Sequence, residues 1–447
     1  MLRALSWILA LLAVAIGHYT HTPYGMRIRG FEIFLIVLFG LTAIAATRKP
    51  AIAAVAALGL VLGLTREIQF ERARQRVESS PIGQRARLGR HLVVGYRSAS
   101  EAEKWLEEGK IGGIFVGAKN ARDRSREELS VELASLRRHG ARWIAADQEG
   151  GAVSRLSPPL AALPPLSTVA GDLAGVEAYG ESHGRDLEAL GVDLNFAPVL
   201  DLATGLPPAL LDLHTRIEER ALGADPQQVG DAAIVYAGAL ERHGVMATFK
   251  HFPGLGRVSA DTHNFEARVH APIADLEATD WAPFRAVIAE RSGAIMVGHV
   301  IVESVDRDRI ATRSRAVISG ILRESMGHQG LIVTDDLCMA PAFHGPGGVG
   351  QAAVDALRAG VDLLLVSYDP DQWFVVMAAL LDADDAGLLA APIADSMLRL
   401  ESGLSRNHRD HVESAHDRIF SDPRASGAPA RGAGVRDASD GARLAGM

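Results

Sequence analysis

A loop that carries Asp261 and His263 two residues apart is the first feature of this chain that could do chemistry. Pro253 and the small residues after it predict a long, flexible excursion from a strand that ends near Phe249. A carboxylate beside an imidazole orients the ring and raises its basicity, and the ordinary pKa of histidine, about 6.5, lies near neutrality. We interpret the pair as a proton shuttle. The plainer alternative is two exposed polar residues, because Asp-x-His is a common spacing.

Asp335 is the second candidate, because it directly follows the apolar run Leu331–Thr334. A carboxylate at the end of a buried parallel strand points into the mouth that the strand ends form, as a nucleophile or charge stabiliser requires. The pair Asp335–Asp336 also precedes a turn, so a helix cap is the structural alternative. A carboxylate nucleophile and a separate proton donor are the minimum set for retaining glycoside hydrolysis. Schiff-base chemistry at Lys250 is the competing interpretation.

The elements that must position these residues begin near Leu88, where short apolar runs alternate with amphipathic helical patterns. Strands are predicted near His91–Gly95, Gly113–Val116, Trp143–Ala146, Asp193–Ala197, Met246–Phe249, Ala294–Val297, Leu331–Thr334 and Leu363–Val366. Helices are predicted at Ser125–His139, Asp225–His243 and Asp280–Arg291. The alternation predicts an α/β fold with a single (β/α)8 TIM-type barrel, and a doubly wound sheet shows the same alternation. Polar residues at five strand ends favour the barrel, because its strand ends meet at one rim.

Composition excludes several classes of protein. The chain has 447 residues, a formal net charge of −8 and no basic tract, which argues against a nucleic-acid partner. Its single cysteine, Cys338, excludes an internal disulfide framework and any cysteine-rich metal site. The sequence contains no serine elbow motif, no Walker loop and no zinc-type histidine spacing. We therefore predict no metal site and no cofactor.

Three apolar runs, at residues 4–17, 33–47 and 50–65, contain no Asp, Glu, Lys or Arg. Each is somewhat shorter than the roughly 20 residues that span a bilayer, and flanking residues can make up the difference. We predict that residues 1–65 form a membrane anchor of three short helices. Buried core helices are the alternative, as is a signal peptide for the first run.

We expect a bacterial-type inner membrane, and the distribution of basic residues around these runs favours the cytoplasmic face for the catalytic domain. One side would hold Arg3, Arg48 and Lys49, and the other Arg27, Arg29, Arg66, Arg72, Arg74 and Arg76. Cleavage of residues 1–17 as a signal would place the domain outside instead. The predicted organisation continues with a linker at 66–87, the barrel at 88–405 and a largely disordered tail at 406–447.

Four motifs in order carry a resemblance to a known family. They are Asp147–Gly151 (DQEGG), Asn195–Asp201 (NFAPVLD), the Lys250–His263 loop and Thr334–Leu337 (TDDL). Together they resemble the motif series of the β-N-acetylhexosaminidases of glycoside hydrolase family 3, over a region from about His91 to Leu400. The resemblance implies a (β/α)8 barrel that removes terminal β-linked N-acetylglucosamine with retention, often from peptidoglycan fragments, so a muropeptide is an expected substrate.

The resemblance also implies the roles of individual residues. Asp335 would be the nucleophile, and His263, paired with Asp261, the general acid/base. The positions that match sugar-binding residues are Asp147, Arg155, Arg220, Lys250 and His251. Glu149 suits a proton donor by its chemistry, but the family pattern makes it structural. Nearby Lys250 and Arg220 are expected to favour the ionised form of Asp335.

Two positions depart from the family pattern. Leu255 stands where the loop usually has a second histidine, and Ala152 stands where an arginine usually follows the Gly-Gly pair. Neither matches a catalytic residue, so we expect activity with an altered leaving-group preference. Two other functions remain open: a β-N-acetylglucosaminide phosphorylase, because a neutral histidine does not repel phosphate as a carboxylate would, and a catalytically silent, membrane-tethered sugar-binding protein.

Overall fold

The computed structural model describes residues 2–47, 49–207, 209, 212, 214–291 and 293–404. Within them, eight strands form one parallel sheet in the order β11-β9-β7-β6-β3-β2-β1-β12. They are β1 (Leu92–Gly95), β2 (Gly113–Val116), β3 (Trp143–Ala146), β6 (Leu194–Asn195), β7 (Met246–Phe252), β9 (Ala294–Val297), β11 (Ile332–Thr334) and β12 (Leu364–Val366). All eight predicted strands are confirmed. β7 extends to Phe252, which places Lys250 and His251 on the strand rather than in the loop after it.

The sheet curves into a nearly closed barrel, because its two edge strands meet. Val333 of β11 bridges Leu363 beside β12, and the Thr334 backbone N donates to the Leu363 carbonyl at 3.0 Å. An apolar cluster that includes Trp143, Phe196 and Met296 fills the inside of the barrel. The meeting of the edges separates this α/β barrel from a doubly wound sheet, whose edges stay apart.

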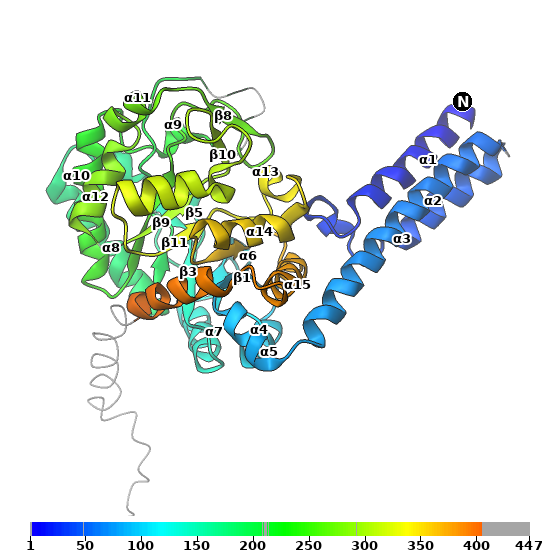
Figure 1. The fold of residues 1–447 in the computed structure, drawn as a ribbon, viewed down its shortest axis with the longest axis horizontal. Coiled ribbons are helices and arrows are strands. Elements are labelled where there is room, and N and C mark those ends of the chain that lie inside the picture. The colour runs from blue at the N-terminus through cyan, green and yellow to red at the C-terminus, as the bar shows by residue number, and fades with distance from the viewer. Residues whose placement is uncertain are drawn as a thin grey trace, which may run out of the picture.

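Helices cover the outside of the sheet (Figure 1). They are α4 (Ile82–Gly89), α5 (Ala99–Glu107), α6 (Ala118–Ala121), α7 (Arg126–Arg138), η2 (Leu166–Thr168), α8 (Leu173–Leu190), α9 (Ile217–Arg220), α10 (Pro226–Glu241), α11 (Ile273–Ala278), α12 (Ala282–Glu290), η3 (Ala311–Arg313), η4 (Ala316–Ser325), α13 (Ala340–Phe343), α14 (Gly348–Ala359) and α15 (Gln372–Asp385), followed by a helix over 390–404. The side chains of Ser125 and Asp225 cap α7 and α10. Small sheets pair β4 (Gln148–Gly150) with β5 (Val153–Ser154), and β8 (Ala267–Val269) with β10 (Val300–Val302).

The N-terminal helices project from one side of the barrel as a slender bundle (Figure 1). The bundle contains α1 (Leu2–Tyr19), α2 (Glu32–Thr47) and α3 (Pro50–Glu78), with the short helix η1 (Pro23–Ile28) between α1 and α2. By length and composition, α1 and α3 could each cross a membrane, whereas the apolar helix Glu32–Ala46 is shorter. Gly17 and Gly59 let α1 and α3 approach closely, since a Cβ on Gly17 would lie 2.2 Å from the Gly59 carbonyl oxygen.

The third apolar helix continues beyond residue 65, where the sequence analysis placed its end. Residues 66–78 contain no Gly or Pro and are rich in Glu, Gln and Arg, which favour helix. This part of α3 lies against α15, where Arg76 pairs with Asp382 at 2.7 Å. The segment 66–87, expected as a linker, is therefore mostly helical, with α4 following α3. Arg48, Ser405 and the expected tail at 406–447 lie outside the described residues.

Candidate active site

Two adjacent carboxylates follow β11, and they have different surroundings. Asp336 is buried and accepts hydrogen bonds from the Cys338 backbone N (2.9 Å), the Ser367 hydroxyl (2.6 Å) and the Tyr368 backbone N (2.7 Å). Asp335 is partly exposed, and its carboxylate accepts a hydrogen bond from the Asp336 backbone N at 2.8 Å. Asp336 thus fixes the loop after β12, and the Asp335 carboxylate keeps an exposed side at the mouth of the barrel.

The pKa of Asp335 lies below its ordinary range. Burial raises this pKa, but the electrostatic influence of His251, His299 and His263 outweighs burial. His299 is itself buried at the end of β9, and its Nδ1 lies 2.7 Å from the Thr312 hydroxyl oxygen. His299 was not among the predicted site residues, although its place just after the apolar run Ala294–Val297 was a signal. Asp335 is therefore ionised at neutral pH, as a carboxylate nucleophile must be.

A buried ion-pair network lies at the ends of β3 and β7. The Lys250 Nζ contacts Asp147 at 2.6 Å and Glu149 at 2.5 Å, and the Arg220 guanidinium binds Glu149 through two nitrogens, at 2.7 and 3.0 Å. Burial raises the pKa of Glu149, but the two cations outweigh it and lower that pKa far below its ordinary value. Glu149 is thus ionised and unsuited to donate a proton. Lys250 and Arg220 were expected to favour the ionised form of Asp335. In the structure they pair with Asp147 and Glu149 instead.

His251 is held in one orientation by a charged residue on each side of its ring. Its Nδ1 lies 2.6 Å from an Asp201 carboxylate oxygen, and its Nε2 lies 3.3 Å from an Arg220 nitrogen. Arginine only donates hydrogen bonds, so we assign the ring proton to Nδ1, which donates to Asp201. Asp201 also accepts from the Leu255 backbone N at 2.6 Å. Asp201 was not among the predicted site residues, although its place directly after an apolar run was the signal.

The predicted Asp261–His263 pair is present in the loop after β7. His263 Nδ1 lies 3.3 Å from Asp261 Oδ1, and the His263 backbone N donates to the same oxygen at 2.9 Å. Asp261 is fully buried and also accepts from Thr215 (3.2 Å) and Asn264 (2.9 Å). Burial raises the pKa of Asp261, but the hydrogen bonds from His263 and Asn264 outweigh it, so the pKa is well below ordinary. An ionised carboxylate therefore lies behind a half-exposed imidazole.

One predicted sugar-binding residue stands apart from the network. Arg155 is exposed, its backbone N donates to the Asp147 carbonyl at 3.1 Å, and its guanidinium has no hydrogen bond or ion pair within the described part of the chain. Ala152, one of the two departures, is exposed in the turn between β4 and β5. Leu255, the other, is buried in the main apolar core.

The described ranges contain no group of three or more His, Cys, Asp or Glu side chains arranged to hold a metal ion.

Comparisons with known proteins identify the family of this chain. The model of the glycosyl hydrolase family 3 N-terminal domain matches residues 84–402. A β-hexosaminidase of Methylococcus capsulatus is 35% identical over 341 residues, which are 74% of this chain and 97% of the relative. A β-hexosaminidase of Xanthomonas oryzae pv. oryzae is 35% identical over 287 residues, 62% of this chain and 82% of the relative.

Solved structures of similar chains indicate the same family. A glycoside hydrolase family 3 β-N-acetylglucosaminidase from Paenibacillus sp. superposes with a TM-score of 0.67 and 31% identity, over 73% of this chain and 63% of the other. LpqI of M. tuberculosis superposes with a TM-score of 0.64 and 30% identity, over 72% of this chain and 93% of the other. This chain therefore belongs to glycoside hydrolase family 3, resembles its β-hexosaminidases, and is a glycosidase that hydrolyses O-glycosyl bonds.

Proposed function

We propose that this protein is a retaining exo-β-N-acetylglucosaminidase that acts through a covalent glycosyl-aspartate intermediate. The observation that carries the proposal is an ionised, partly exposed Asp335 within the electrostatic influence of His263, whose imidazole is backed by the buried Asp261. These groups supply a nucleophile, a proton shuttle and a positioning carboxylate at one barrel mouth.

The reaction would proceed in two steps. In the first, an Asp335 oxygen attacks the anomeric carbon while the protonated His263 gives its proton to the glycosidic oxygen, so that the bond to the leaving group breaks. In the second, neutral His263 takes a proton from water, and the water oxygen displaces Asp335 from the same carbon. Two inversions return the original configuration. Asp261 would orient the imidazole and stabilise its positive charge in the first step.

The network beside the nucleophile would bind the sugar. Asp147 after β3, Lys250 on β7 and Arg220 on α9 present hydrogen-bonding groups close to one another, and His251 lies next to Arg220. The guanidinium of Arg155, exposed at the rim, would reach the sugar once substrate is bound. The β-N-acetylglucosaminidase from Paenibacillus sp. supports N-acetylglucosamine as the sugar. We propose terminal β-linked N-acetylglucosamine of peptidoglycan fragments, including muropeptides, as the natural substrate.

The test is to assay the full-length protein in detergent with chromogenic β-N-acetylglucosaminide and β-glucoside in parallel. Turnover confined to the N-acetyl sugar is expected. Turnover of the glucoside alone would contradict the proposal. Addition of phosphate separates hydrolysis from phosphorolysis, because only the latter gives a sugar 1-phosphate. Sugar binding without product from either glycoside would mean a silent binding protein.

We further propose that residues 1–65 anchor the protein in an inner membrane with the barrel on the cytoplasmic face. Support comes from the apolar helices α1 and α3 and from the concentration of arginines at the barrel end of the bundle. Protease added to intact spheroplasts should leave the barrel whole, whereas protease added to inverted membrane vesicles should digest it. Digestion in intact spheroplasts would place the barrel outside.

A further inference from the structure

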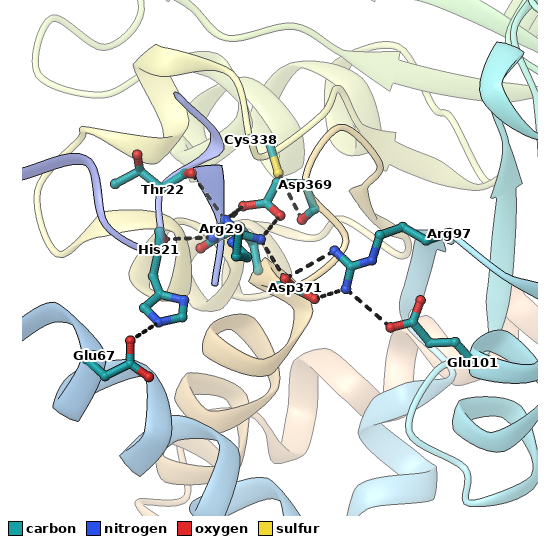
Figure 2. Close-up of polar contacts among 10 residues, drawn as sticks. His21, Thr22, Arg29, Glu67, Arg97, Glu101, Cys338, Asp369 and Asp371 are labelled. Carbon is teal, nitrogen blue, oxygen red and sulfur yellow. Dashed lines mark hydrogen bonds and ion pairs between the residues drawn. The ribbon is translucent and has the colours of Figure 1, made fainter. Parts of the chain in front are cut away.

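The segment between the first two apolar helices, residues 20–31, lies against the barrel, although it is outside the region that the family model matches. We call it the docking segment. Its Arg29 guanidinium binds the carboxylates of Asp369 and Asp371, in each case with a contact of 2.6 Å, and these carboxylates lie just after β12 (Figure 2). Asp369 is fully buried, and Asp371 is nearly so. Burial lowers the pKa of Arg29, but these carboxylates outweigh it, so the net pKa is raised.

Further contacts hold the docking segment in the same place. The Gln372 side chain donates to the His21 carbonyl at 2.9 Å. The His21 ring stacks on Phe70 of α3 with centroids 4.1 Å apart, and its Nε2 lies 2.8 Å from Glu67 (Figure 2). Arg97 binds Asp371 from the barrel side. The docking segment is therefore fixed both to the barrel and to the extended part of α3.

The loop that Arg29 binds lies next to the nucleophile. Asp369 follows Ser367 and Tyr368, which are the residues that the Asp336 carboxylate holds. The Cys338 thiol, three residues past Asp335, lies 3.7 Å from the Asp369 carbonyl oxygen (Figure 2). One short loop thus separates the docking segment from Asp335.

Tyr24 brings the docking segment close to the acid/base loop. Its ring stacks on His344, with centroids 5.5 Å apart and planes 11° apart. The His344 backbone N donates to the Ala340 carbonyl, and the Ala340 backbone N donates to the His263 carbonyl, each at 2.8 Å. Tyr24 nevertheless remains 45% exposed. Its pKa is raised, mainly by burial and in part by the negative charge of Asp261, which is consistent with this proximity.

We propose that the docking segment completes the leaving-group side of the active site, with Tyr24 as the aromatic surface on which the sugar beyond the scissile bond packs. This inference rests on the proposed hydrolysis of β-N-acetylglucosaminides. The acid/base protonates the glycosidic oxygen, so the leaving group must lie beside His263. The C–H face of a pyranose ring is apolar and packs on an aromatic ring, and an exposed tyrosine provides such a ring with a polar edge.

The test compares two substrates of the full-length protein in detergent. Methyl β-N-acetylglucosaminide has almost nothing beyond the scissile oxygen, whereas N,N′-diacetylchitobiose has a second sugar there. Tyr24→Ala should lower kcat/KM for the disaccharide by about 3- to 10-fold, the range expected for an aromatic contact. The methyl glycoside should change by less than about 2-fold. Tyr24→Phe keeps the ring and should restore the disaccharide rate.

Phe31→Ala is the matched control, because Phe31 is an exposed aromatic residue of the same segment and lacks a ring partner among the described residues. It should leave both rates unchanged. An unchanged disaccharide rate in Tyr24→Ala, or an equal loss on both substrates, would overturn the inference while the wild-type turnover left the proposed function intact. Absence of turnover of both glycosides by the wild type would instead remove the proposed function, and this inference with it.

Discussion

At the residue scale, the chemistry depends on how Asp335 and Asp336 differ. The Asp336 carboxylate accepts hydrogen bonds from four donors, which are the Ser367 hydroxyl and the backbone N atoms of Cys338, Ser367 and Tyr368. The Asp335 carboxylate accepts from the neighbouring Asp336 backbone N and stays partly exposed. A carboxylate that accepts hydrogen bonds from several buried donors has a structural role, because moving it would leave those donors unpaired. Asp335, which accepts fewer hydrogen bonds, suits the proposed role of nucleophile.

Substitution of each carboxylate should separate the two roles. Asp335→Asn should lower kcat by about 10³-fold or more, because an amide cannot form the glycosyl ester, while the unfolding midpoint stays close to wild type. Asp336→Ala should instead destabilise the protein by about 2 kcal/mol, since it leaves buried donors unpaired. Initial rates and thermal melts of the two variants provide the measurement. An active Asp335→Asn enzyme would contradict the assignment of the nucleophile.

At the element scale, the proposed sugar-binding network joins residues that different elements supply. Glu149 comes from β4, Arg220 from α9 and Lys250 from β7. All three are largely buried, and their charges are tolerable there because they compensate each other. Together with Asp147, they form an electrostatically balanced network near the proposed nucleophile, Asp335.

Glu149→Gln should remove the carboxylate that Arg220 and Lys250 share and leave two buried cations undercompensated. We expect a loss of about 3 kcal/mol in the free energy of unfolding, together with a lower kcat/KM as the cations shift. Denaturant unfolding and steady-state kinetics measure the two effects. Glu127→Gln, at an exposed acid in the first turn of α7, is the control and should cost less than about 1 kcal/mol. Equal effects of the two substitutions would show that the network contributes no more to stability and activity than an exposed acid does.

At the scale of the whole molecule, buried neutral histidines make the free energy of unfolding depend on pH. Burial lowers the pKa of His183 from 6.5 to about 4 and is the largest influence that lowers the pKa of His328 to about 4. The Asn195 amide donates to the Tyr236 hydroxyl, which we infer donates in turn to His183 Nδ1 at 2.9 Å. Nε2 of His183 then carries the proton and has no partner in the described part of the chain.

The stability should therefore fall as the pH is lowered from 6.5 towards 4. In this window the unfolded chain binds protons at these histidines and the folded chain does not, so each histidine costs up to about 3 kcal/mol at pH 4. His183→Asn keeps an acceptor for Tyr236 but does not titrate, and should make the dependence of the melting temperature on pH shallower. An identical dependence in wild type and variant would show that His183 is not one of the groups responsible.

Much of the fold was accessible from sequence alone. All eight sheet strands, and the helices that Ser125 and Asp225 cap, follow from short apolar runs and capping residues. The proximity of Asp261 to His263 follows from their spacing, and the position of Asp335 follows from the strand before it. These features lie within windows of a few residues, where backbone geometry restricts where side chains point.

Only the tertiary structure decided which distant groups meet. It brings Lys250 into contact with Asp147 and Glu149, and it brings Arg29 into contact with Asp369. It also places three histidines where they lower the pKa of Asp335 electrostatically. Arg29 and Asp369 are 340 positions apart, and no local pattern indicates such a pair. The physical reason is that a pattern along the chain reports the neighbours of one element, whereas the partners of a buried charge depend on which elements the closed barrel and the bundle beside it bring together.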